Sequence, residues 1–178
     1  WFSSLIKKAD RPIKVLNLFA YTGGATMAAA KAGAQVVHVD ASKGMVAMAK
    51  ENAQLCGLSD APIRYIVDDC KKFVEREIRR GNKYDGIIMD PPSYGRGPNG
   101  EVWKLEDNID ELITLVSQVL SDEPLFFLVN SYTTGLSPAA VGYILNTTLK
   151  TRFGGKTELD EIGLKVTQTG EILPCGAS

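Results

Sequence analysis

Short apolar runs alternate with longer segments of helical character along most of this 178-residue chain. The apolar runs predict strands at residues 13–19, 35–39, 63–67, 84–89 and 125–129. The segments that follow them predict helices at residues 24–32, 43–55, 71–80, 108–120 and 137–150. Strands that alternate with helices form a parallel sheet covered by helices on both faces. The pattern therefore predicts an α/β protein.

The end of the chain departs from this alternation. Two further strand-like runs, residues 159–166 and 171–175, are separated only by residues 167–170, which is the length of a hairpin connection. We expect one of these strands to run antiparallel to its neighbour, an arrangement that is unusual in dinucleotide-dependent dehydrogenases. Residues 95–100, rich in glycine and proline, are the one long flexible loop that we expect.

Length and composition favour one domain. A hydrophobic content of 44% is enough for one core, so we expect residues 1–178 to form a single domain. The chain lacks an initiator methionine and stops abruptly, which indicates a piece of a longer protein whose other domains are missing. The net charge of -1 gives no general attraction for nucleic acid.

Cysteine and histidine usage argues against a metal site. The three cysteines lack metal-ligand spacing, and His38 is the only histidine, so we expect neither bound metal nor a disulfide scaffold. No apolar stretch reaches the ~20 residues of a membrane helix, and no cleavable leader is visible. We expect a soluble, cytoplasmic protein without a membrane partner.

The turn after the first strand, residues 19–25, is the first candidate ligand site. Its adjacent glycines differ from the G-x-G-x-x-G fingerprint, but glycine lets a backbone approach a ligand, and the next helix offers free N–H groups to an anion. Asp40 ends the second strand, about where a carboxylate binds ribose hydroxyls. Alternatively, Asp40 or Ser42 caps the next helix.

The third strand is followed by two adjacent acidic residues, Asp68 and Asp69. Asp68 offers a carboxylate to an adenine amine, and Cys70 can line the ring. The alternative is that one of Asp68 and Asp69 caps the helix that follows. For Asp68 the sequence leaves both roles open.

The fourth strand ends in Asp90, Pro91, Pro92 and Ser93. A proline has no N–H and cannot continue a strand, so the chain breaks into an extended turn at the sheet edge where α/β proteins bind ligands. We interpret these four residues as a reaction loop. Further along, Arg96, Lys104 and Trp103 can hold a phosphate and stack on a base, although solvated charge and packing explain them more simply.

These motifs resemble those of class I S-adenosylmethionine-dependent methyltransferases over nearly the whole chain. Residues 17–24, 39–40, 68–69 and 90–97, the last including Gly97, more narrowly resemble the family of 23S ribosomal RNA methyltransferases related to the cytosine 5-position enzymes. The resemblance implies S-adenosylmethionine as cofactor and ribosomal RNA as substrate. It also implies a Rossmann-like seven-stranded sheet with an antiparallel last strand, and an RNA-binding domain before this catalytic one.

The resemblance also implies roles for individual residues. Residues 19–24 would cradle the methionine part, Asp40 would bind the ribose, and Asp69 with Cys70 would bind the adenine. The expected cofactor-binding residues are Phe19, Ala20, Tyr21, Thr22, Gly23, Gly24, Asp40, Ser42, Asp68, Asp69 and Cys70. The expected catalytic residues are Asp90, Pro91, Pro92 and Ser93, and the expected substrate-binding residues are Tyr94 and Arg96. Asn17 stands where many class I enzymes carry an acid.

The sequence leaves the acceptor atom open. Methylation of pyrimidine carbon 5 needs a cysteine thiolate, and residues 128–133, where the cytosine enzymes carry it, contain none. The alternative is transfer to nitrogen, because Asp-Pro-Pro loops resemble the Asn/Asp-Pro-Pro-Tyr signature of amino-group methyltransferases. A second hypothesis is a nucleotide-binding Rossmann-like domain, either a fragment of an NAD-dependent oxidoreductase or a catalytically degenerate binding module.

Overall fold

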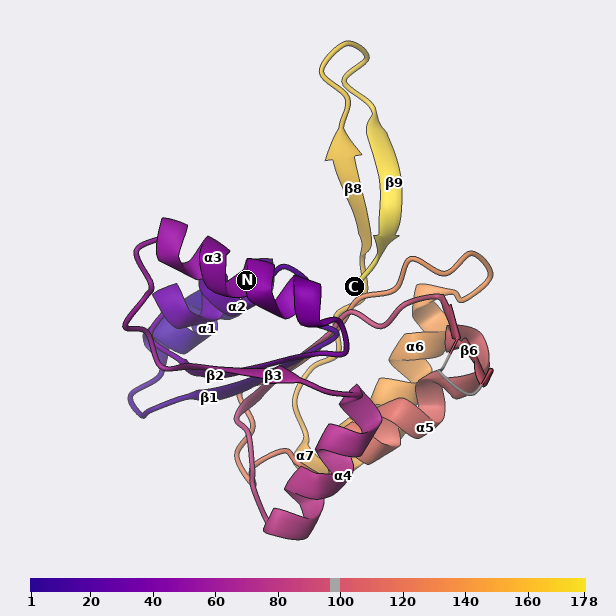
Figure 1. Cartoon of the computed structure of the whole chain (residues 1–178). Coiled ribbons are helices and arrows are strands. Elements are labelled where there is room, and N and C mark those ends of the chain that lie inside the picture. Colours follow the sequence, from indigo (N-terminus) through magenta and orange to yellow (C-terminus); the bar gives the residue numbers. More distant parts are fainter. Residues whose placement is uncertain (97–99) are drawn as a thin grey trace. The chain divides into compact units, whose positions relative to one another are not determined.

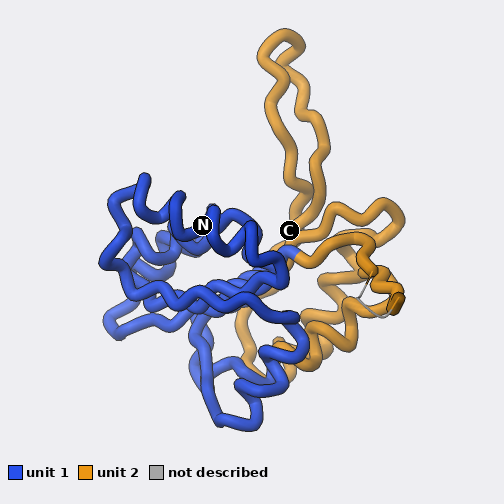
Figure 2. Tube along the Cα trace, viewed as in Figure 1, with its two compact units in different colours: residues 1–90, 118–128 blue, residues 91–117, 129–178 orange. Residues whose placement is uncertain are grey.

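A computed structural model (Figure 1) describes residues 1–96 and 100–178 of the chain. Gly97 of the reaction-loop motif, and with it residues 98 and 99 of the predicted flexible loop, lie outside the described residues. The chain divides into two compact units, which Figure 2 colours separately. The first is formed by Trp1–Asp90 with Gln118–Leu128, and the second by Pro91–Ser117 with Val129–Ser178.

The first unit contains the alternating strands and helices. Its elements are α1 (Phe2–Lys8), β1 (Lys14–Leu18), α2 (Gly24–Lys31), β2 (Gln35–Asp40), α3 (Lys43–Leu55), β3 (Ile63–Val67), α4 (Cys70–Arg80), β4 (Gly86–Met89) and most of β7 (Phe126–Val129). The predicted strands and helices of this region are confirmed to within about two residues, and only α1 lacks a counterpart in the prediction.

The sheet order places β1 near the centre. The strands run in the order β3-β2-β1-β4-β7, and β1 pairs in parallel with both β2 and β4. Val15, Leu16 and Leu18 of β1 are completely buried, as is Ile87 of β4. Because the paired strands are parallel, the carboxyl ends of β1, β2, β3 and β4 share one edge of the sheet. We call this the carboxyl edge.

The predicted seven-stranded sheet is wrong for the described residues, in which the main sheet has five parallel strands. The predicted tail hairpin exists as β8 (Glu161–Lys165) and β9 (Ile172–Ala177), which pair antiparallel but form a two-stranded sheet of their own. The backbone hydrogen bonds of this small sheet run between β8 and β9. The one described bridge from β9 to the segment after β7 is isolated and joins Ala177 to Ser131.

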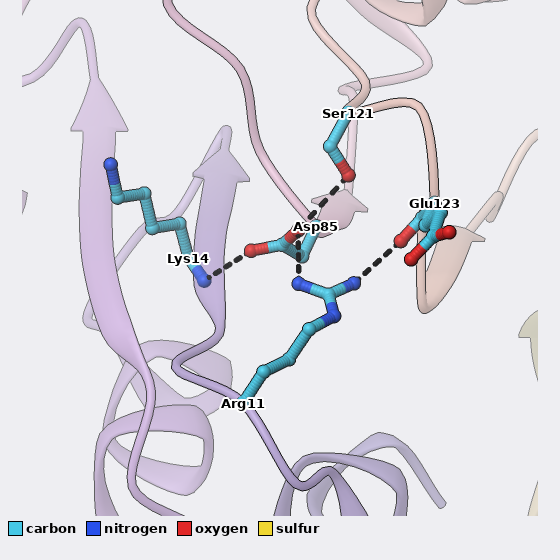
Figure 3. Close-up of polar contacts among 5 residues, drawn as sticks. All are labelled: Arg11, Lys14, Asp85, Ser121 and Glu123. Carbon is cyan, nitrogen blue, oxygen red and sulfur yellow. Dashed lines mark hydrogen bonds and ion pairs between the residues drawn. The ribbon is translucent and has the colours of Figure 1, made fainter.

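The opposite edge of the sheet is held by the carboxylate of Asp85, just before β4 (Figure 3). Its Oδ1 accepts hydrogen bonds from Arg11 Nη1 at 2.6 Å and from Ser121 Oγ at 2.9 Å. Its Oδ2 accepts the backbone N–H of Lys14 at 2.9 Å. Arg11 Nη2 also donates to the carbonyl of Glu123, at 2.5 Å. This cluster joins the segments that precede β1, β4 and β7.

The second unit contains the remaining elements. They are β5 (Tyr94–Arg96), β6 (Val102–Lys104), α5 (Leu105–Ser117), α6 (Pro138–Leu145), a π-helical turn η1 (Asn146–Lys150), α7 (Thr151–Phe153), β8 and β9. The predicted helix 137–150 is therefore α-helical only to Leu145. The Thr147 hydroxyl donates to the carbonyls of Tyr143 and Ile144, a side-chain bond that competes with the regular helical ladder.

The flexible loop predicted at residues 95–100 is wrong at its beginning. Tyr94–Arg96 forms β5, which pairs antiparallel with β6 in a second two-stranded sheet. Glycine at position 95 suggested a loop, but it is the central residue of β5 and lies directly opposite Trp103 in the hairpin. Among the described residues, no helix has both the length and the apolar character needed to cross a membrane.

Candidate functional site

The turn after β1 has an unusual backbone. Phe19 and Tyr21 have φ values of 55° and 49°, and Gly23 has 86°. Left-handed backbone at two residues that are not glycine is energetically costly and is concentrated at ligand-binding sites. The turn is held by Asn52, whose Nδ2 donates to the carbonyl of Thr22 at 3.0 Å. Sequence reasoning selected the turn but not its anchor on α3.

Asp40 fixes this turn from the end of β2. Its Oδ2 accepts the backbone N–H of Tyr21 at 2.9 Å, and its Oδ1 accepts that of Ser42 at 2.8 Å. The cap of α3 is Ser42, whose Oγ accepts the N–H of Met45 at 3.4 Å. Asp40 is half-buried, and each of its oxygens has a second lone pair, so the carboxylate can still accept hydrogen bonds from a ligand.

The end of β3 divides its acidic pair between two tasks. Asp69 caps α4 by accepting the N–H of Lys72 at 2.9 Å. Asp68 forms an ion pair with Arg76 and accepts the N–H of Asp69. The predicted alternative, that one of the two aspartates caps the next helix, is therefore confirmed for Asp69 and not for Asp68.

Cys70 joins the ends of the first three strands. Its Sγ accepts the N–H of Phe19 at 3.3 Å and lies 3.9 Å from the carbonyl oxygen of Val39. Burial raises the pKa of the Cys70 thiol to about 12, the nearby carboxylates add to the rise, and the hydrogen bond from Phe19 opposes it. The side chain is thus a neutral thiol that holds the carboxyl edge together and cannot act as a nucleophile.

A buried polar chain runs beneath the turn. Asn17 Nδ2 donates to Thr26 Oγ1 at 2.9 Å, and Thr26 Oγ1 lies 2.9 Å from His38 Nδ1. Which of the hydroxyl and the ring nitrogen donates in this second contact depends on the tautomer of His38. Burial lowers the pKa of His38 to about 4, against the opposing charge of Asp40, and keeps the ring neutral. Asn17 is therefore committed to the core.

No partner for His38 Nε2 is found among the described residues, although the side chain is completely buried. Its ring packs 5.4 Å from that of Tyr65. A Cβ at Gly23 would lie 3.6 Å from this ring and 3.1 Å from the Cβ of Ala49. The glycine thus lets the turn lie close to both the histidine and α3, a reason for this residue that the sequence did not reveal.

The predicted reaction loop follows β4. Asp90, half-buried, ends the first unit, and burial raises the pKa of its carboxyl above the usual value. Within the second unit, the carbonyl of Pro92 accepts the indole N–H of Trp103 at 2.7 Å. Ser93 Oγ accepts the hydroxyl of Thr133 at 2.8 Å, and the Ser93 carbonyl accepts the N–H of Leu105 at 3.0 Å. Sequence reasoning missed Thr133.

The hairpin of β5 and β6 places the predicted substrate-binding residues on one face. Tyr94 lies opposite Lys104, and Arg96 lies opposite Val102. These four side chains are exposed, whereas Gly95 and Trp103, on the other face, are half-buried. Arg96 Nε donates to the phenol oxygen of Tyr94 at 2.9 Å.

Two other features lie away from this arrangement. A cavity of about 490 Å³ opens at the opposite edge of the sheet, lined in part by Lys14, Gln35, Ile63 and Glu77, so it does not belong to the carboxyl edge. The described residues contain no cluster of histidine, cysteine, aspartate or glutamate that could hold a metal ion.

Comparison with known proteins gives relatives for half of the chain. Ribosomal RNA large subunit methyltransferase I of Aeromonas salmonicida is 42% identical over 90 residues, which are 50% of this chain and 23% of that protein. The enzyme of the same name from Salmonella arizonae is 40% identical over 82 residues, 46% of this chain and 20% of that protein. The matched segment is thus less than a quarter of the length of either relative.

Solved structures extend the similarity to the whole chain. A SAM-dependent methyltransferase from Agrobacterium tumefaciens has a TM-score of 0.90 and 40% identity, and the match covers 99% of this chain and 58% of that one. A protein described as a methyltransferase and solved in complex with SAH has a TM-score of 0.72 and 25% identity, with 89% and 40% covered.

The family itself follows from a sequence model described as S-adenosylmethionine-dependent methyltransferase, which matches residues 4–120. That segment holds every strand of the main sheet except β7, together with the left-handed turn, Asp40 and the reaction loop. Because the match covers more than half of the sequence, the chain belongs to the S-adenosylmethionine-dependent methyltransferases.

Proposed function

We propose that this chain carries the catalytic domain of an enzyme that methylates a base of ribosomal RNA, with S-adenosylmethionine as methyl donor. The observation that carries the proposal is the Asp-Pro-Pro-Ser loop at the carboxyl end of β4, in a family whose named relatives act on ribosomal RNA. The proposal includes an RNA-binding domain elsewhere in the protein, because the net charge of this chain is -1. It also includes a cytoplasmic setting, in which the three free thiols stay reduced.

The residues of the carboxyl edge fit the cofactor. We propose that Asp40 accepts hydrogen bonds from the ribose hydroxyls with the lone pairs that Tyr21 and Ser42 leave open. The left-handed turn is proposed to hold the methionine part. The adenine is assigned to the end of β3, at Asp68, Asp69 and Cys70. The remaining proposed contacts in the turn come from Phe19, Ala20, Thr22, Gly23 and Gly24.

The reaction loop is proposed to receive the base. When bound, S-adenosylmethionine supplies an electrophilic methyl group on its sulfonium. Asp90 and the carbonyl of Pro91 accept the N–H groups of a base amine, which leaves the nitrogen lone pair directed at that methyl group. The N–C bond would form as the C–S bond breaks and S-adenosylhomocysteine leaves with the electron pair, and Asp90 would take the proton that the methylated amine releases. The raised pKa of its carboxyl suits this second task.

An amine acceptor is favoured because no cysteine is suited to attack a pyrimidine ring. Cys70 is a buried neutral thiol, Cys56 lies exposed at the end of α3, and the Cys175 thiol donates to the carbonyl of Leu173 in β9. Carbon 5 becomes nucleophilic only after a thiolate has added to carbon 6. Nitrogen needs no such step, so we assign the methyl group to an exocyclic amine.

The test is methylation of ribosomal RNA fragments with tritium-labelled S-adenosylmethionine, followed by nucleoside mass spectrometry. We expect an N-methyl nucleoside from the wild type and a loss of about 100-fold in kcat for Asp90→Ala, which removes the oxygens that accept the amine N–H and the proton. Asp107→Ala, at an exposed position in the first turn of α5, is the matched control. A 5-methyl pyrimidine, or full activity of Asp90→Ala, would refute this assignment.

Calorimetry separates the cofactor classes. The chain is expected to bind S-adenosylhomocysteine and not NADH. Binding of NADH alone would instead support the oxidoreductase hypothesis, and binding of S-adenosylhomocysteine without methyl transfer to any RNA would support a degenerate binding module.

A further inference from the structure

The reaction loop cannot hold itself in place. Pro91 and Pro92 are consecutive and neither has an N–H, so this stretch of backbone offers only carbonyl acceptors. A loop with acceptors alone can be fixed only by donors from other segments. The structure therefore raises the question of which groups supply those donors.

Trp103 supplies the first donor. Its indole N–H lies 2.7 Å from the carbonyl oxygen of Pro92, which is within the short range of N–H···O bonds. The pairing of β5 with β6 turns Trp103 to the half-buried face of the hairpin, opposite Gly95. The ring is thus directed toward the loop backbone, and not to the exposed face that carries Tyr94 and Arg96.

Thr133 supplies the second donor. It follows β7, and its hydroxyl donates to Ser93 Oγ at 2.8 Å. The N–H of Thr133 in turn donates to Ser131 Oγ at 3.3 Å. Ser131 is buried and is paired with Ala177 of β9 by two backbone hydrogen bonds, of 2.9 and 2.8 Å. The hydroxyl that contacts Ser93 therefore comes from a segment that is itself held by the backbone pairing of Ser131 with β9.

We infer that Trp103 and Thr133 are positioning residues that fix the Pro92–Ser93 part of the reaction loop, an inference that rests on the proposed function. Each of these donors ties one acceptor of the loop, the Pro92 carbonyl or the Ser93 hydroxyl, to another segment, and the role of Trp103 is to hold the loop, not to stack on a base. Asp90 and the Pro91 carbonyl are the acceptors left to the target amine. Catalysis by orientation is sensitive to small displacements of such a loop.

Two isosteric variants test the inference. Trp103→Phe keeps an aromatic ring but removes the indole N–H, and Thr133→Val keeps the shape but removes the hydroxyl donor. Each is expected to lower kcat about tenfold, the value of one hydrogen bond. The dissociation constant for S-adenosylhomocysteine and the midpoint of urea unfolding are expected to stay at the wild-type values, which a merely structural role would not produce.

Matched controls use the same chemistry elsewhere. Trp1→Phe removes an indole N–H from the start of α1, and Thr134→Val removes an exposed hydroxyl beside Thr133. Neither is expected to change kcat.

A measurement independent of turnover is hydrogen exchange at the Ser93 amide, followed by mass spectrometry of peptides that span the loop. Faster exchange in Trp103→Phe and Thr133→Val than in the controls supports the inference. If the wild type methylates no RNA, the proposed function fails, and exchange alone decides the positioning role. Wild-type exchange in both variants, or unchanged kcat in both, overturns the inference.

Discussion

Asp40→Asn is the sharpest test of cofactor binding at the carboxyl edge, because each of the two carboxylate oxygens accepts one backbone hydrogen bond. Oδ2 accepts the N–H of Tyr21, and Oδ1 accepts that of Ser42. An asparagine has one acceptor oxygen and one amino group, which only donates. In either orientation of the amide, one of these two backbone N–H groups faces another donor, so the left-handed turn loses one of its two ties to β2.

The expected loss can be worked out from these bonds. A hydrogen bond to a charged group contributes about 1.5 to 3 kcal/mol, and Asp40 is half-buried, so water replaces part of what is lost. We take about 2 kcal/mol for the combined loss of the turn contact and of the negative charge that is proposed to bind the ribose. This corresponds to about 30-fold weaker binding of S-adenosylhomocysteine.

Titration calorimetry with S-adenosylhomocysteine measures this directly. Asp60→Asn is the matched control, since Asp60 is exposed in the connection between α3 and β3 and is expected to leave the affinity unchanged. Urea unfolding of both variants shows whether the substitution lowers only the cofactor affinity or also the stability of the domain. An affinity of Asp40→Asn within threefold of the wild type would show that this carboxylate does not bind the cofactor.

Three further predictions concern stability and reactivity. Asp85→Ala should cost about 2 kcal/mol in urea unfolding at pH 7, because it removes a buried carboxylate that accepts part-buried hydrogen bonds from Arg11, Lys14 and Ser121. Burial opposes the low pKa of Asp85, but hydrogen bonds and a neighbouring positive charge lower it, so the difference from the wild type should shrink below about pH 4; a difference that grew there would contradict this. Gly86→Ala should cost about 2 kcal/mol in the same assay, since its Cβ would lie 2.4 Å from the ring of Phe126, and wild-type stability would refute that contact. A maleimide at pH 7.5 should modify Cys56 rapidly and Cys70 only after unfolding, as peptide mass spectrometry would show; equal rates would argue against a buried Cys70.

The parallel sheet could be predicted because its strands are short, mainly apolar runs that alternate with segments of helical character. Residues 63–67 and 43–55, for example, have the predicted bounds for β3 and α3. The short helix α1 could not, since its N-cap, Trp1, makes no side-chain capping bond that a sequence motif would reveal. The seven-stranded sheet came from resemblance, and alternation alone does not say that β8 and β9 pair only with each other.

The candidate site divides in the same way. Asp40 and the glycine turn stand out in sequence, because a glycine turn after one strand and a carboxylate about 20 residues later, at the end of the next, together form a nucleotide-binding pattern. Asp69 is the helix cap and Asp68 is not, because α4 begins at Cys70. Two adjacent aspartates in the sequence do not show at which of them the helix begins. The contacts of Trp103 and Thr133 with the reaction loop join segments distant in sequence, so only the folded chain reveals them.

The position of β1 bears on the order in which the domain can form during synthesis. Val15 pairs with Val36 on one side and with Gly86 on the other, so its second neighbour leaves the ribosome long after its first. A nascent chain that ends between β3 and β4 has β1, whose residues 15–18 are all buried in the folded domain, open along one side. Such open strands are where nascent chains associate wrongly or are cut. Protease sensitivity of arrested chains is therefore expected to fall once residues 86–89 have emerged, and not before.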